Sequence, residues 1–158
     1  NGESALKRLN RDVLSQTGVT DVILLEGIND IAKMPHNYNH TQIINGMKKI
    51  AKEAHKKGLR IYVGTLTPFR DASYLQYDWT FTEQGEETRE KVNAWIRSNK
   101  DFDGVIDFEK AIANPQDPDR MLPVYDSGDH IHPNSTGYQA MANAIDLSVF
   151  KPSSKVKH

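Results

Sequence analysis

An aspartate and a histidine three residues apart stand near the C-terminus, in the segment YDSGDHIHPN (residues 125–134). The carboxylate of Asp129 can hold the imidazole of His132 in one tautomer, so that the ring acts as a general base. Pro133 stiffens the loop that carries both groups. The spacing therefore predicts a general base, which would still need a nucleophile and an oxyanion hole. The alternative interpretation is a turn in which Asp129 and Asn134 only cap the next helix.

The same segment also allows a metal site. His130 and His132 form a His-x-His pattern, which together with a nearby aspartate resembles a metal-binding strand. Such a site needs further ligands, and His36 and His40 are the candidates. Their loop shows no ordered pattern of ligands, so we expect no metal and no other cofactor.

A second candidate group follows the apolar run at residues 22–25. Asn29, at the end of a buried strand, can point its amide at a developing oxyanion, and one such donor is worth roughly 3 kcal/mol. Gly27 lets the backbone turn sharply and leaves room for a substrate. Asn-Asp after a strand is also ordinary turn chemistry, so the motif alone is weak.

The composition is that of one globular domain. The chain has 158 residues, of which 37% are hydrophobic and 26% charged, and we expect a domain over residues 1–150 with a polar tail over residues 151–158. A net charge of -1 gives no attraction for nucleic acid, and no apolar run is long enough to span a bilayer. With no cysteine, disulfides and a thiol nucleophile are excluded, while exported and cytosolic locations both remain open.

The elements that must position these groups alternate between helix and strand. Helical spacing of apolar residues predicts helices over residues 5–14, 41–58, 83–98 and 135–147, and short aliphatic runs predict strands over residues 21–25, 59–66 and 105–108. This alternation indicates βαβ units and a parallel sheet covered on both faces. The expected fold class is a three-layer α/β/α sandwich of flavodoxin-like style.

Two long connections, residues 31–40 and 69–82, follow the carboxyl ends of strands, where open α/β sheets bind their ligands. The second contains several aromatic residues, among them Tyr77 and Trp79, which suit stacking on a sugar or aryl group. We take these two residues and Gly27 as candidate substrate-binding residues. The alternative is that the rings only pack the loop against the body.

Together, the two motifs resemble the SGNH hydrolases, also called the GDSL esterase/lipase family. The sequence LEGIND at residues 25–30 looks like that family's third block, and DSGDHIHPN at residues 126–134 looks like its fifth. Order and separation agree, and the resemblance extends over about residues 4–145. Two matching blocks in the right context are more specific than either alone.

The resemblance implies a serine-dependent ester hydrolase that needs no cofactor. Asn29 would be an oxyanion donor, His132 the base and Asp129 the residue that orients it. The polar composition and the aromatic loop favour a small-molecule ester, either a carbohydrate-linked acyl group or a short-chain ester.

The nucleophile is the large departure from the family. Its first block, Gly-Asp-Ser, and its second block, which carries an oxyanion glycine, are not recognisable. Gly2-Glu3-Ser4 mimics the first block but stands too close to Asn29 for a strand, a crossover helix and another strand. We therefore expect a separate N-terminal segment to complete the sheet and to supply the serine. A non-catalytic carbohydrate-binding or scaffold domain and a metal-dependent hydrolase remain the alternatives.

Overall fold

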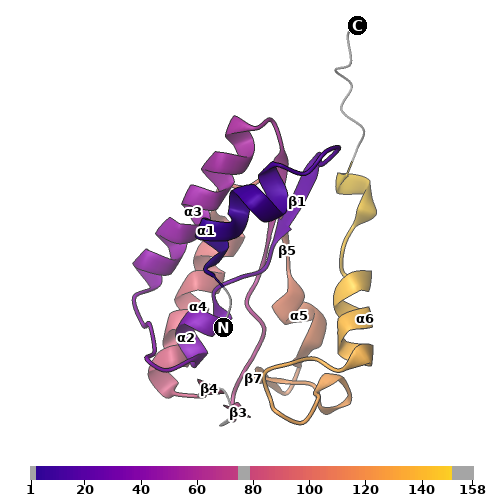
Figure 1. Cartoon of the computed structure of the whole chain (residues 1–158). Helices are drawn as coiled ribbons and strands as arrows, with labels where there is room; N and C mark the ends of the chain where they lie inside the picture. The colour runs from indigo at the N-terminus through magenta and orange to yellow at the C-terminus, as the bar shows by residue number, and fades with distance from the viewer. Residues whose placement is uncertain (1–2, 75–78, 151–158) are drawn as a thin grey trace, which may run out of the picture.

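A three-stranded parallel sheet forms the centre of the protein, as the sequence predicts. The computed structural model describes residues 3–74 and 79–150 (Figure 1). In its sheet β2 (Arg60–Gly64) lies between β1 (Asp21–Leu24) and β5 (Gly104–Ile106). All three strands run parallel. Their carboxyl ends therefore share one edge, where the candidate site must lie.

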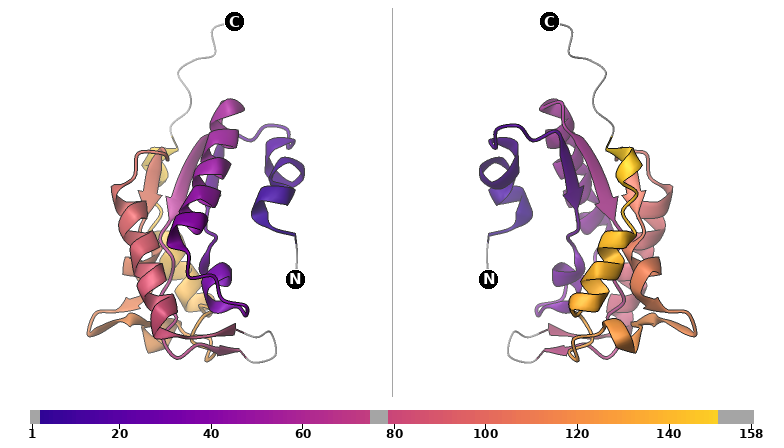
Figure 2. Two further views of the ribbon diagram at one scale, coloured as in Figure 1. Left: turned by 90° about the vertical axis from the view of Figure 1, so that its left-hand side faces the viewer. Right: turned by 90° about the vertical axis from the view of Figure 1, so that its right-hand side faces the viewer.

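Helices cover both faces of this sheet, which makes the predicted three-layer α/β/α sandwich. Helices α3 (His40–Lys56) and α4 (Glu83–Ser98) lie on one face, and α5 (Phe108–Ile112) and α6 (Ser135–Asn143) lie on the other (Figure 2). Helix α1 (Ala5–Leu9) continues as a π-helical turn, η1 (Asn10–Leu14), beside α3. No helix within the described residues is long and apolar enough to cross a membrane.

Shorter elements complete the described chain. They are a helix α2 (Ile28–Ala32), the hairpins β3 (Ser73–Tyr74) with β4 (Trp79–Thr80) and β6 (Ala113–Asn114) with β7 (Asp117–Met121), and the 3-10 turns η3 (Pro123–Tyr125) and η4 (Leu147–Val149). The sequence analysis predicted neither α2 nor the short strands β3, β4, β6 and β7. The expected tail, residues 151–158, lies outside the described residues.

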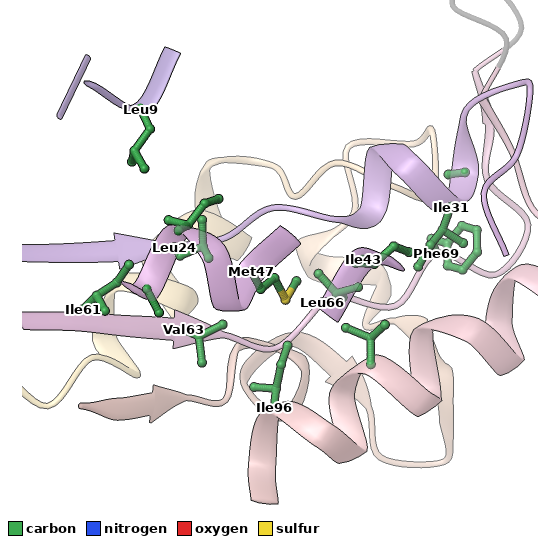
Figure 3. Close-up of a cluster of buried hydrophobic side chains, with 14 of the residues drawn as sticks. Leu9, Leu24, Ile31, Ile43, Met47, Ile61, Val63, Leu66, Phe69 and Ile96 are labelled. Carbon is green, nitrogen blue, oxygen red and sulfur yellow. The ribbon is translucent and has the colours of Figure 1, made fainter. Parts of the chain in front are cut away.

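Two apolar cores lie on opposite sides of the sheet because side chains alternate along β2. Ile61 and Val63 enter the larger core under α3 and α4, together with Met47 and Ile96 (Figure 3). Tyr62, between them, faces the smaller core under α5 and α6. The central strand therefore holds both helical layers.

Strand and helix ends differ from the predictions for local reasons. The third strand was expected to reach Phe108, but Asp107 caps α5, its side chain accepting a hydrogen bond from the Lys110 N–H at 3.2 Å. The second strand ends at Gly64 because the chain then enters a loop held by side chains of α4. The last helix ends at Asn143, four residues short of the prediction.

Buried polar side chains of α4 hold the loop after β2 in place. The Asn93 side chain accepts a hydrogen bond from the Leu66 N–H at 2.7 Å and donates one to the Leu66 carbonyl at 2.8 Å. Arg89, fully buried, donates to the same carbonyl and pairs with Glu86 and Glu109. Buried backbone groups need such partners, so this network holds the sheet edge beside the candidate site.

Candidate active site

The loop before α6 brings Asp129 and His132 into direct contact. Asp129 Oδ2 lies 2.6 Å from His132 Nδ1. Its other oxygen, Oδ1, accepts hydrogen bonds from the Ile131 N–H at 3.1 Å, the His132 N–H at 2.8 Å and the Ser127 hydroxyl at 3.0 Å. The carboxylate therefore holds both the imidazole and the backbone that carries it.

These hydrogen bonds keep Asp129 ionised. Burial alone would raise the pKa of the Asp129 carboxyl, but the bonds from His132, Ile131 and Ser127 outweigh burial and lower the pKa to about 2. The ionised carboxylate therefore accepts a hydrogen bond from the Nδ1–H group of His132. This tautomer leaves Nε2 of the same ring to accept a proton.

The loop is also anchored to the body of the protein. Asn134 caps α6, its side-chain oxygen accepting from the Gly137 N–H at 3.0 Å, while its amide donates to the carbonyls of Val124 and Asp126. Ile131 is buried in the larger core. The helix-capping interpretation is thus correct for Asn134, whereas Asp129 bonds within the loop.

A second aspartate–histidine pair precedes the first. Asp126 Oδ2 lies 2.6 Å from His130 Nδ1, and Oδ1 of the same carboxylate accepts from the Gly128 and His130 N–H groups. The sequence analysis considered His130 only as a metal ligand and missed this pair, although its four-residue spacing is visible in the sequence. Each histidine therefore directs its Nδ1 towards a carboxylate.

Among the described residues, the side chains that could together hold a metal ion are acidic and lie outside this loop. Glu86, Glu90 and Asp119 each direct a carboxylate oxygen to within 4.8 Å of the others. Glu86 already pairs with Arg89, and Asp119 with Arg70. Neither His130 nor His132 belongs to this cluster.

Asn29 lies in a short helix, α2, and not at a strand end as expected. Gly27 is the residue before α2 and has a φ of +124°, a region that L side chains rarely adopt. A Cβ there would lie 3.2 Å from Met47 Cε and 3.4 Å from Ile43 Cγ2. The sharp turn predicted at Gly27 is therefore present, and it exposes Asn29 in the first turn of α2.

A cleft of about 570 Å³ opens beside this turn, between α1, α2 and α3. Gly27, Asn29 and Asp30 line one wall, and Ser4 lies on another. Asp30 also lines the cleft, where partial desolvation raises the pKa of its carboxyl. The cleft thus contains two of the sequence-predicted groups, Gly27 and Asn29, together with the mimic serine.

Trp79 lies against the candidate base. The rings of Trp79 and His132 have centroids 5.0 Å apart and planes inclined by 35°. Phe81 instead packs on Phe69 in the larger core, which is the packing alternative for these aromatics. Tyr77 lies outside the described residues.

Four of the described serines occupy different parts of the molecule. Ser4 precedes α1 at the cleft, Ser73 is in β3, and Ser127 bonds Asp129. The Ser98 hydroxyl donates to carbonyls of its own helix, α4. None has the strand-to-helix turn of a nucleophile elbow.

The family of the chain is shown by its sequence. The sequence matches the GDSL-like Lipase/Acylhydrolase family over residues 1–140, and the chain belongs to this family. A comparison with curated proteins found no match.

Solved structures share the fold at low sequence identity. A GDSL-like lipase from Bacteroides thetaiotaomicron superposes with a TM-score of 0.69 at 18% identity, over 92% of this chain and 68% of that chain. A protein assigned as an acylhydrolase from Bacteroides fragilis gives 0.70 at 20% identity, over 92% and 67%. A protein assigned as a lipolytic member of the G-D-S-L family from Desulfitobacterium hafniense gives 0.64 at 18%, over 89% and 70%.

Asp129→Asn should remove a pH-dependent part of the stability. The pKa of Asp129 is about 2 in the folded protein against an ordinary value of 3.8, so ionised Asp129 stabilises the fold above about pH 4. The side chain is 19% exposed, and the shift corresponds to about 2 kcal/mol. This stabilisation is lost as the pH falls through about 2.

Urea unfolding of the wild type and the variant between neutral pH and about pH 2 measures this difference. The gap in unfolding free energy should be largest near neutrality and should close in acid. Ser127→Ala, which removes one donor to Asp129, should show a smaller gap of the same sign. A gap independent of pH would contradict the stabilising role of the charge.

Proposed function

We propose that the protein hydrolyses carboxylic esters through a serine acyl-enzyme, with His132 as base, Asp129 as its orienting partner and Asn29 as an oxyanion donor. The observation that carries the proposal is the 2.6 Å contact between Asp129 and His132 Nδ1 in a member of the GDSL-like lipase/acylhydrolase family. An ester hydrolase is the activity that this family indicates.

The chemistry follows from the orientation of the ring. Nε2 of His132 takes the proton of the attacking serine hydroxyl as the Oγ–carbonyl bond forms. The carbonyl oxygen becomes an oxyanion, which the amide of Asn29 stabilises. The imidazolium then gives its proton to the leaving alcohol, and a water molecule repeats the sequence to release the acid. Asp129, ionised, stabilises the imidazolium.

For the substrate we propose a carbohydrate-linked acyl group or a short-chain ester. The open cleft beside Gly27 and Asn29 is lined in part by polar and charged side chains, among them Asp30 and Arg8, which favours a polar ester over a long lipid chain. Trp79 and Tyr77 are proposed as aromatic contacts for the substrate.

The nucleophile is proposed to come from a segment outside these 158 residues. Among the described residues β1 pairs only with β2, and Ile23 in β1 and Leu25 just after it are 41% and 40% exposed. Apolar edges of parallel sheets are normally covered. A parallel strand that paired with β1 would cover Ile23 and Leu25. Its carboxyl end would lie at the same end of the sheet as Asn29.

A non-catalytic carbohydrate-binding or scaffold domain of the same family is the second candidate. It differs from the enzyme in lacking a serine that reacts, so labelling experiments separate the two. A metal-dependent hydrolase would use both His130 and His132, so paired substitutions test it.

His132→Ala in the intact protein should lower kcat roughly 10⁴-fold or more, because the serine loses its base. Hydrolysis of p-nitrophenyl acetate measures the change, and circular dichroism checks the fold. His130→Ala is the matched control on the same loop and should retain most of the turnover. Equal losses of kcat in both variants would favour the metal-dependent alternative. Near-normal turnover of His132→Ala would contradict the assignment of His132 as the base.

Asn29→Ala should lower kcat about 10²–10³-fold with little change in KM, because the amide acts on charge that develops only in the transition state. Steady-state kinetics with the same ester measure both constants. Asn143→Ala, at an exposed position of α6, is the control and should leave both unchanged. A change confined to KM would show that Asn29 only binds substrate or shapes the turn.

A serine-directed fluorophosphonate should label the intact protein at a serine in a Gly-Asp-Ser peptide outside residues 1–158. Peptide mapping by mass spectrometry identifies the adduct, and His132→Ala should slow its formation. Labelling of Ser4, or full activity of residues 1–158 folded alone, would overturn the external nucleophile. Absence of any labelled serine would favour the non-catalytic domain.

A further inference from the structure

We propose that Trp79 is a positioning residue that fixes the imidazole plane of His132 and sets the base relative to the helix that carries Asn29. This inference rests on the proposed function and adds to it. The substrate contact proposed for Trp79 needs only an exposed ring, whereas positioning needs the ring to be held and to touch the base. Both conditions are met in the described residues.

The backbone of Trp79 is joined to the end of α2. Lys33, the residue after α2, forms an antiparallel bridge with Trp79. The next residue, Thr80, has its hydroxyl 3.3 Å from His36 Nε2, and Nδ1 of the same ring donates to the Ile31 carbonyl at 2.8 Å. Two connections therefore tie this strand to the helix that carries Asn29.

The other side of the segment is held by the loop after β2. The Phe81 N–H donates to the Ala72 carbonyl at 2.9 Å, and the Phe81 ring packs on Phe69. The partly buried Trp79 side chain itself packs against the larger core. The Trp79 indole is consequently held against the body of the protein. Figure 1 shows α2, β4 and the loop before α6 at the same end of the molecule.

The hydrogen bond that His132 Nδ1 donates to Asp129 does not by itself fix the plane of the imidazole ring. It fixes the position of Nδ1, but the ring can still swing about that contact, which moves Nε2. The Trp79 ring, with its centroid 5.0 Å away and its plane inclined by 35°, limits this swing. Together, the two contacts restrict the direction in which Nε2 points. A misplacement of about 1 Å at a reacting group can cost about 10²-fold in rate.

Substitution of Trp79 in the intact protein tests the proposal by separating kcat from KM. Trp79→Leu should lower kcat about 10–100-fold, and Trp79→Phe, which keeps a flat ring, should restore most of it. The loss should appear in kcat even if the substrate contact also raises KM. Trp95→Leu, a matched change at a partly buried tryptophan of α4, controls for general loss of packing.

A second readout does not depend on turnover. In NMR spectra of the same protein with ¹³C-labelled histidine, the His132 ring protons should carry a ring-current shift that Trp79→Leu removes and Trp79→Phe partly keeps. Increased KM with unchanged kcat in Trp79→Leu would overturn positioning and leave only substrate contact. Unchanged His132 shifts would overturn the ring contact itself. A protein without esterase activity would refute the proposed function, while the NMR result would still decide the contact.

Discussion

The Asp129 carboxylate is the group on which the candidate site depends. It is mostly buried, and burial would favour its neutral form, yet donors from His132, Ile131 and Ser127 hold its pKa at about 2. Those same bonds shape the loop, because two of them come from its backbone. The charge of the Asp129 carboxylate and the geometry of its loop therefore depend on the same hydrogen bonds. A change that loosens the turn also weakens the partner of the imidazole.

Parallel strand topology explains why groups from opposite ends of the chain lie at the same end of the sheet. Helix α2, with Asn29, follows β1, and the loop with His132 precedes α6, yet α2 and this loop lie at the same end of the molecule (Figure 1). The loop after β2 is held in this arrangement, because Asn93 binds both backbone groups of Leu66 and buried Arg89 binds its carbonyl. These polar contacts are costly to break, since each would leave a buried group without a partner. The loop after β2 is thus held by α4, a helix that supplies none of the proposed catalytic groups.

Features with local causes were predictable from the sequence, and features with long-range causes were not. The bounds of α4 follow from the Thr82 cap and the apolar spacing behind it, and the turn at Gly27 follows from the conformational freedom of glycine. Asp129 and His132 meet because three residues of a turn span the distance. By contrast, the position of Trp79 depends on pairing with Lys33, far away in the sequence, and an aromatic residue type does not reveal that. The strand β7 contains Asp and Pro, poor strand formers, so its pairing with β6 comes from tertiary context.

The two aspartate–histidine pairs of the loop differ in ways that favour His132 as the base. Both imidazoles contact a carboxylate at 2.6 Å, so the hydrogen bond alone does not distinguish them. His130 has a φ of +62°, and its side chain is the more exposed of the two, which suits a turn position at the surface. His132 follows the buried Ile131 and lies against Trp79, which the backbone joins to the Asn29 helix. Catalysis needs a base held in a fixed relation to the oxyanion donor. Of the two histidines, His132 has contacts that connect it through Trp79 to the helix of the proposed donor, Asn29, and Asp126 with His130 is best understood as support for the turn.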